Sequence, residues 1–193
     1  HAFLFHGPAG VGKTAAAFAF AGVQLGDARR VVERTHPDLM VIEPLGEMIR
    51  IKQIDVLHHD LHLRPFEADR RVYLLLGAHL LNVEAANKLL KDLEEPPLYA
   101  TIVLVADTLG PIPETIRSRC QPIPFRRLSE RAVREWLAVE APELGEAETT
   151  ALARVAPDEA KRRMPAAVAH PVWQARAAAA AAAALMEAPE WAL

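Results

Sequence analysis

The sequence predicts an α/β fold in which a parallel sheet is flanked by helices, followed by a small helical domain. Three observations lead to this prediction. Short, continuous apolar runs of strand length recur through the first 125 residues. Segments with helical patterns lie between these runs, and only helical patterns follow them. Unbroken apolar strands that alternate with helices are typical of a parallel sheet covered on both faces.

The first elements follow from local composition. Residues 2–5 form an apolar strand that ends at a glycine-rich loop. Residues 14–23 are rich in alanine, the residue with the highest helix propensity, and predict a helix. Residues 39–42 form a short apolar strand after a His-Pro pair. Residues 53–63 carry apolar side chains at helical spacing, and Pro65 closes this helix.

The next three elements complete the predicted sheet. Residues 71–76 contain a continuous apolar run and predict a strand. Residues 82–93 predict a helix with Asn82 as its N-cap, stopped by two prolines shortly after its end. Residues 101–105 form another apolar strand.

We expect a domain boundary near residues 126–128, because only helical patterns follow Phe125. Residues 1–126 are predicted to form the α/β domain and residues 127–193 the helical domain. Eight consecutive alanines at 177–184 leave the end of the helical domain undefined. The chain opens at His1 directly before an apolar strand, so we expect further residues to precede it.

Composition excludes several classes of protein. The chain has 193 residues, of which 51% are hydrophobic and 24% charged, which excludes a disordered chain. No apolar run approaches the roughly 20 residues of a membrane-spanning helix. The net charge of −3 argues against a protein that binds nucleic acid mainly through its own basic surface. The single cysteine, Cys120, excludes an internal disulfide and suits a reducing compartment, so we expect a cytoplasmic location.

The glycine loop matches the phosphate-binding pattern Gly-x-x-x-x-Gly-Lys-Thr between a strand and a helix. Glycines allow successive backbone N–H groups to surround phosphate oxygens, and the first helical turn adds its free N–H groups. Lys13 would reach the β- and γ-phosphates, and the Thr14 hydroxyl would ligate magnesium. With ATP or ADP and Mg²⁺ as the expected ligands, the predicted nucleotide-binding residues are Gly7, Pro8, Gly10, Val11, Gly12, Lys13 and Thr14.

Hydrolysis needs more than this loop. A P-loop ATPase also holds magnesium with an acidic residue at the end of a neighbouring strand. The best candidate strand, 71–76, is followed by Gly-Ala-His, which contains no carboxylate. The sequence therefore predicts a nucleotide cradle without intrinsic ATPase activity.

Three further segments carry a family resemblance. They are residues 87–97 (Asn-Lys-Leu-Leu-Lys-Asp-Leu-Glu-Glu-Pro-Pro), residues 115–120 (Thr-Ile-Arg-Ser-Arg-Cys) and residues 35–39 (Thr-His-Pro-Asp-Leu). In sequence, order and spacing they resemble motifs of the AAA+ clamp-loader subunits of bacterial DNA polymerase III. The resemblance covers residues 2–125 and implies a P-loop AAA+ sheet with a helical lid. We expect the family's C-terminal collar domain to be absent from this chain.

Departures from the family pattern point to one kind of subunit. The gamma and tau motor subunits end the strand corresponding to 71–76 with an Asp-Glu pair, where this chain has Leu76 and Gly77. Motor subunits also carry a zinc-binding cysteine cluster, for which residues 25–35 supply no cysteine. At the end of strand 101–105, the motor subunits usually have a Thr or Asn sensor residue, whereas this chain reads Ala106-Asp107-Thr108. The resemblance thus favours the delta-prime type, which implies no zinc and no ATP hydrolysis of its own.

The resemblance also assigns a site in the Ser-Arg-Cys segment. Arg119 matches the family's arginine finger, which reaches the γ-phosphate of ATP held by an adjacent motor subunit, and Ser118 and Cys120 are its motif partners. The implied partners are the gamma or tau and delta subunits, the sliding clamp and, through the assembled complex, primed DNA. No membrane partner and no metal site in the protein are expected.

The sequence is also compatible with other interpretations. One is a motor ATPase of the same family, and another is a small-molecule kinase with the same loop. His58 and His62 have a zinc-compatible spacing, but without a further ligand a polar helix face is favoured. Arg119 could be an ordinary surface residue, and Cys120 is expected to be buried rather than nucleophilic. Four arginines form a local basic cluster: Arg126, Arg127, Arg131 and Arg134. For this cluster, packing of the lid or a subunit contact is favoured over DNA binding.

Overall fold

The computed structural model describes residues 1–126 together with residues 131, 134, 145 and 146. These residues contain the whole predicted α/β domain. The predicted helical domain lies outside the described residues, apart from those four positions. Arg131 and Arg134 of the predicted basic cluster are exposed.

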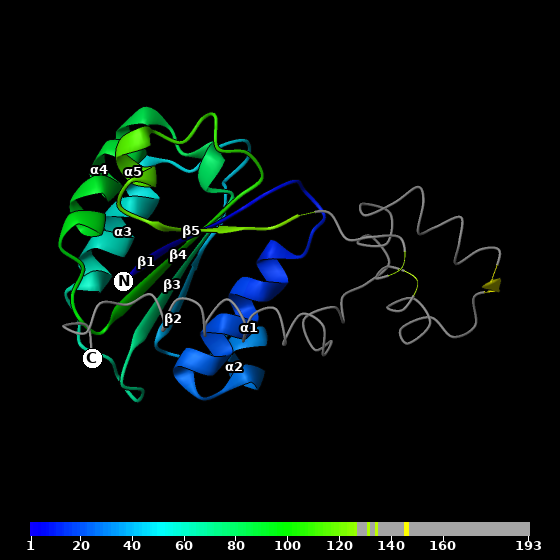
Figure 1. Ribbon diagram of the computed structural model, residues 1–193. Helices are drawn as coiled ribbons and strands as arrows, with labels where there is room; N and C mark the ends of the chain where they lie inside the picture. Colours follow the sequence, from blue (N-terminus) through cyan, green and yellow to red (C-terminus); the bar gives the residue numbers. More distant parts are fainter. Residues whose placement is uncertain (127–130, 132–133, 135–144, 147–193) are drawn as a thin grey trace.

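Five parallel strands form one sheet in the order β2-β3-β4-β1-β5, which confirms the predicted parallel sheet. β1 lies inside the sheet, with β4 on one side and β5 at the edge on the other. The sheet is drawn at the centre of Figure 1. The strands are β1 (Ala2–His6), β2 (Leu39–Ile42), β3 (Arg71–Leu76), β4 (Ala100–Ala106) and β5 (Gln121–Pro124).

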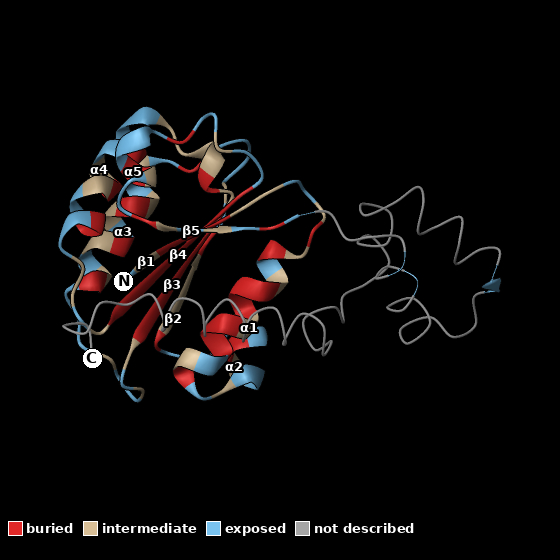
Figure 2. Cartoon of the chain, viewed as in Figure 1, coloured by how far each residue is buried: buried red, intermediate tan, exposed pale blue. Residues whose placement is uncertain are grey.

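Helices cover both faces of the sheet (Figure 1). α1 and α2 lie on one face, and α3, α4 and α5 lie on the other. Figure 2 shows buried residues along the strands and on the inner sides of the helices, with exposed residues facing outward. The helices are α1 (Lys13–Leu25), α2 (Ala28–Val32), α3 (Ile51–Leu61), the 3₁₀ helix η1 (Ala78–Leu80), α4 (Val83–Glu94) and α5 (Glu114–Arg117).

Alternation along the strands divides the core into two halves. Phe3 and Phe5 of β1 pack under α1, where their rings meet Phe20 edge-on at centroid distances of 5.3 and 6.2 Å. Leu4, between them in sequence, packs in the other half with residues of α3 and α4. β1, β3 and β4 thus supply buried side chains to both halves, as expected for strands buried on both faces.

The predicted elements are present, with small differences at their ends. β2 and β3 have the predicted bounds. α3 ends two residues earlier than predicted, at Leu61. Asn82 caps α4 as predicted, because its Oδ1 accepts a hydrogen bond from the Ala85 N–H at 2.9 Å. Four short elements were not predicted: α2, η1, α5 and β5.

β5 was missed because its sequence, Gln-Pro-Ile-Pro, resembles a loop. Proline has no N–H to donate and is confined to edge strands, bulges and strand starts. β5 is an edge strand that pairs on one side with β1, so its prolines are compatible with the sheet. β5 is thus the last strand of the sheet on the side of β1, and it ends next to the glycine loop.

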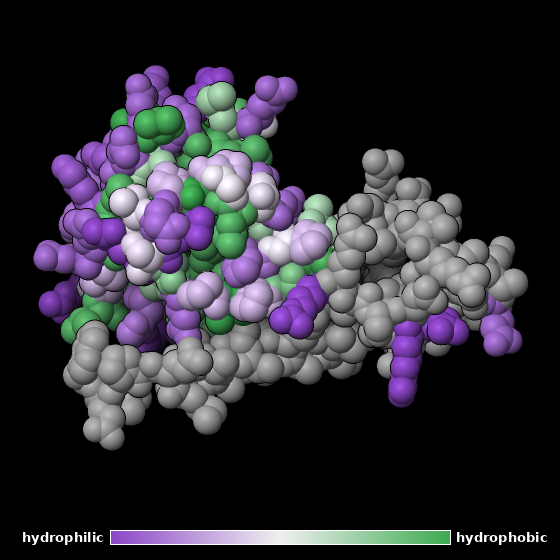
Figure 3. Space-filling model, turned by 45° about the horizontal axis from the view of Figure 1, so that its top comes forward, coloured by the Kyte–Doolittle hydropathy of each residue, from purple (hydrophilic) through white to green (hydrophobic). Residues whose placement is uncertain are grey.

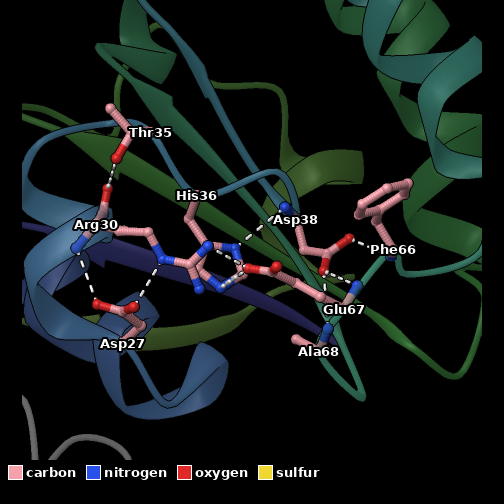
Figure 4. A network of polar contacts seen from close by, with 8 residues as sticks. All are labelled: Asp27, Arg30, Thr35, His36, Asp38, Phe66, Glu67 and Ala68. Carbon is pink, nitrogen blue, oxygen red and sulfur yellow. Dashed lines mark hydrogen bonds and ion pairs between the residues drawn. The ribbon is translucent and has the colours of Figure 1, made fainter.

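A buried polar network anchors the loop before β3 to the segment before β2 (Figure 4). Asp38 is 1% exposed and accepts three backbone hydrogen bonds, from the N–H groups of Phe66 at 2.6 Å and of Glu67 and Ala68 at 2.9 Å. The buried His36 Nδ1 accepts a hydrogen bond from the Asp38 N–H at 3.1 Å. The His-Pro-Asp segment therefore has a structural role.

On the face of the described domain shown in Figure 3, hydrophilic side chains surround apolar ones toward the middle. Large apolar side chains with high exposure include Leu98 at 90% and Phe66 at 82%. Among the described residues, no helix combines the length and the apolar character needed to cross a membrane.

The Asp38 network yields a stability prediction. Replacing Asp38 with Asn places amide donors among three backbone donors, so we expect the free energy of unfolding in urea to fall by about 2 kcal/mol. Asp69→Asn, an exposed change in the same loop, should alter it by less than about 0.5 kcal/mol. An equal effect of both variants would contradict the assigned role of the Asp38 carboxylate.

The same network has a pH dependence. Burial alone would raise the pKa of Asp38, but the three backbone donors and the nearby Arg71 charge hold this pKa below its ordinary value. A carboxyl with a depressed folded-state pKa stabilises the fold above its unfolded pKa, and this contribution is lost as the pH falls through the folded value. The difference between wild type and Asp38→Asn should therefore shrink below about pH 4.

Candidate functional site

The glycine loop connects β1 to α1 at the carboxyl edge of the sheet (Figure 1). Gly7 has a φ of +145°, and a Cβ atom there would lie 2.0 Å from the backbone oxygen of Phe125. The Phe125 N–H in turn donates a hydrogen bond to the His6 carbonyl at 2.7 Å. Glycine is required because β1 and the chain leaving β5 approach each other closely at this point.

Lys13 is the first residue of α1, and its side chain is buried beside the loop. Its Nζ donates hydrogen bonds to the carbonyl oxygens of Gly7 at 2.7 Å and Pro8 at 2.6 Å. It also forms an ion pair with Asp107 Oδ1 at 2.8 Å. The lysine that would contact phosphate is thus neutralised by a carboxylate of its own chain.

The other predicted nucleotide-binding residues lie around this lysine. Val11 is buried in the core half under α1, whereas Thr14, in the first turn of α1, is exposed. Gly10 and Gly12 have φ values of +88° and +87°, and the Gly12 carbonyl accepts the hydrogen bond of the Ala16 N–H at 2.9 Å. The side chain of Thr14 is thus exposed at the loop, whereas that of Lys13 is buried.

The carboxylate that pairs with Lys13 belongs to Asp107, directly after β4. β3 ends at Leu76 and is followed by Gly77, which has a φ of +78° and leads into η1. β4 lies between β3 and β1, and Asp107 follows its last residue. The sequence signal for the Lys13–Asp107 pair was the position of Asp107 directly after a strand, but the pairing itself was not predicted.

His6 ends β1 beside the loop. Burial lowers the pKa of His6 below its ordinary value, and the positive charges of Arg117 and Lys13 lower it further. The positively charged form of His6 is therefore disfavoured beside the loop.

The Ser-Arg-Cys segment forms the short connection between α5 and β5. Arg119 Nη1 donates a hydrogen bond to the Thr115 carbonyl at 2.8 Å, and Nη2 forms a 2.6 Å ion pair with Glu94 at the end of α4. The Arg119 side chain is 34% exposed. The Ser118 hydroxyl donates to the same Thr115 carbonyl at 3.2 Å.

Cys120 is buried in the core half under α3 and α4. Burial raises the pKa of its thiol to about 12. A thiol of this pKa is protonated at pH 7 and is a poor nucleophile. The expectation that Cys120 is a small buried residue is confirmed.

The Ser-Arg-Cys segment and the glycine loop lie at opposite ends of the strands: the first precedes β5, and the second follows β1. β1 and β5 are parallel, and Phe3 pairs with Gln121. At their other ends His6 pairs with Pro124. The glycine loop begins after His6, whereas Arg119 precedes Gln121, so the two segments are separated by the length of the strands. The five residues of β1 span about 13 Å at 3.3 Å per residue.

The histidines of α3 have a structural partner. His58 Nδ1 lies 2.6 Å from Oδ1 of the buried Asp92 on α4, and the His58 and His62 rings are 5.0 Å apart between centroids. Within the part of the chain that the structure describes, no three or more His, Cys, Asp or Glu side chains are grouped to hold a metal ion. His58 joins α3 to α4 rather than forming only a polar helix face.

Solved structures with this arrangement define the class of fold. A DNA polymerase III gamma subunit-related protein from Thermotoga maritima is 23% identical with a TM-score of 0.53, covering 83% of this chain and 55% of that chain. The RuvB Holliday junction branch migration motor of the same organism is 16% identical with a TM-score of 0.53, covering 79% and 48%. These similarities show an α/β P-loop fold, which confirms the predicted fold class.

The family follows from the sequence comparison. Residues 1–129 match the family model described as DNA polymerase III, delta subunit. The chain belongs to this family, which confirms the predicted resemblance.

Individual relatives agree with this membership. The DNA polymerase III subunit delta' of Bacillus subtilis is 33% identical over 149 residues, which cover 71% of this chain and 45% of the relative. The DNA polymerase III subunit tau of the same organism is 34% identical over 155 residues, covering 69% and 26%. The matches span less than half the length of either relative.

The close approach at Gly7 yields a testable prediction. Gly7→Ala would force a Cβ against the Phe125 backbone and impose a strained φ, so we expect a loss of about 3 kcal/mol or more in the free energy of unfolding. Gly110→Ala is the matched control, because the nearest atom to its added Cβ is 4.0 Å away. Urea unfolding measures both. A Gly7→Ala protein as stable as the control would contradict this packing.

Proposed function

We propose that this chain is part of a delta-prime-type clamp-loader subunit, which does not hydrolyse ATP and supplies Arg119 to ATP bound by a neighbouring motor subunit. The observation that carries this proposal is the position of Arg119. Arg119 lies at the amino ends of β1 and β5, whereas the chain's own glycine loop lies at their carboxyl ends. The Arg119 side chain is in a partly exposed connection. From there it serves a nucleotide held by another molecule better than one held by its own loop.

The chemistry of arginine fits this role. A guanidinium group stays charged and can pair with two phosphate oxygens at once. An arginine supplied in trans stabilises the charge that develops on the transferred phosphoryl group, an effect of about 10³–10⁵ in rate. A chain can therefore retain Arg119 while lacking the carboxylates of a complete ATPase site.

The chain's own loop is proposed to bind ATP or ADP with Mg²⁺ without cleaving it. Lys13 and Thr14 lie where phosphate and magnesium contacts are expected, which supports binding. A phosphate must compete with Asp107 for Lys13, which opposes binding. The absence of an acidic residue directly after β3 supports a nucleotide that is held rather than hydrolysed.

The proposed partners follow from the family. They are the gamma or tau and delta subunits, and through the assembled complex the sliding clamp and primed DNA, in the cytoplasm. The net charge of −3 agrees with a subunit that meets DNA within a complex rather than alone. The similarity to the tau relative leaves a motor ATPase as the competing function. Leu76 and Gly77, where a motor subunit needs carboxylates, favour the delta-prime type.

The arginine proposal predicts unequal effects of two substitutions. In the full-length protein assembled with motor subunits, clamp and primed DNA, Arg119→Ala should reduce turnover at the adjoining ATPase site about 10³-fold. The total ATPase rate of the complex should fall by the fraction that this site contributes. Lys13→Ala, which alters the chain's own loop, should have a smaller effect. Unchanged ATPase with Arg119→Ala would remove the proposed role of the arginine.

The loop proposal predicts the effect of removing the competing carboxylate. Asp107→Asn should strengthen ATP binding by the full-length protein about two- to fivefold, because Lys13 is released and a negative charge near the phosphates is removed. Titration with a fluorescent ATP analogue measures the affinity, and Lys13→Ala is the control expected to weaken it. Weaker binding by Asp107→Asn would show instead that the carboxylate assists the ligand.

A further inference from the structure

Glu94 holds the guanidinium group of Arg119 across two elements that are far apart in sequence. Glu94 is the last residue of α4, and its Oε1 lies 2.6 Å from Arg119 Nη2. The Thr115 carbonyl accepts from Nη1 at 2.8 Å, so the two terminal nitrogens are held from different elements. A guanidinium with both ends anchored has lost most of its freedom to rotate.

These contacts leave capacity for a ligand. A guanidinium has five N–H donors, and among the described residues Arg119 uses two of them, one to Glu94 and one to Thr115. The side chain is 34% exposed, and Glu94 is 50% exposed. The group is therefore oriented by its own chain while its remaining donors are available to an incoming phosphate.

A neighbouring arginine lacks this arrangement. Arg117 pairs with Glu114 at 2.9 Å within the single turn of α5, three residues apart. That pair joins no second element, unlike the Glu94–Arg119 pair, which spans 25 residues and links α4 to the connection before β5. Arg117 and Glu114 thus form a natural control for an exposed ion pair without an orienting role.

We propose that Glu94 is a positioning residue that orients Arg119, through the hydrogen bond it accepts, for the γ-phosphate of ATP in the neighbouring subunit. This inference rests on the proposed function of Arg119. Orientation before binding lowers the conformational cost of forming the phosphate contact, and small misplacements of a catalytic group are costly in rate. Exposed ion pairs contribute little to stability, so Glu94 can be replaced without unfolding the chain.

The test uses the full-length protein assembled with motor subunits, clamp and primed DNA. The quantity measured is the Arg119-dependent ATPase rate, which is the rate of the complex minus that of the Arg119→Ala complex. Glu94→Ala should lower this rate about five- to tenfold at unchanged KM for ATP. Glu94→Gln, whose amide oxygen can accept the same hydrogen bond, should retain at least about half of it. Glu114→Ala should leave it unchanged.

Relaxation of the Arg119 Nε–H group, measured by NMR on the isolated full-length protein, gives a second readout. Glu94→Ala should make this group more mobile, whereas Glu94→Gln should not. An unchanged or raised ATPase rate with Glu94→Ala would overturn the inference, and so would a Gln variant as impaired as the Ala variant. If Arg119→Ala itself left the ATPase unchanged, the proposed function would fail together with this inference.

Discussion

The parallel pairing of β1 with two neighbours, β4 and β5, is the constraint on which both candidate sites depend. Hydrogen bonds continue beyond the strand ends, from the Gly7 N–H to the Ala106 carbonyl at 3.3 Å and from the Phe125 N–H to the His6 carbonyl at 2.7 Å. This close approach leaves no space for a Cβ at Gly7. The pairing also fixes the glycine loop at the carboxyl ends of the strands and the start of β5 at their amino ends.

Lys13 and Arg119 each form an ion pair with a carboxylate of their own chain, but the two ion pairs have different consequences. Asp107 contacts Lys13 where a phosphate would bind, so in the proposed function it competes with the ligand. Glu94 contacts one end of the Arg119 guanidinium and leaves other donors unused among the described residues, so it orients the group. The position of each carboxylate, rather than its charge, decides between the two effects.

The sequence predicted much of the fold because its signals are local. Continuous apolar runs identified β2 and β3 with their bounds, and the glycine motif placed the loop between β1 and α1. β5 carries two prolines, and only its edge position makes it a strand. The pairing of Arg119 with Glu94 was also not predicted, because residues 25 apart meet only through the packing of α4 against α5. The arginine was found through its motif, but its partner was not.

ATP turnover by the full-length protein, measured first alone and then with motor subunits, clamp and primed DNA, tests the central claim most directly. The account predicts no turnover by the protein alone, because no acidic residue directly follows β3. It predicts that adding the protein raises turnover in the mixture, and that this rise requires Arg119. Magnesium-dependent turnover by the isolated protein would contradict the account and favour a motor ATPase.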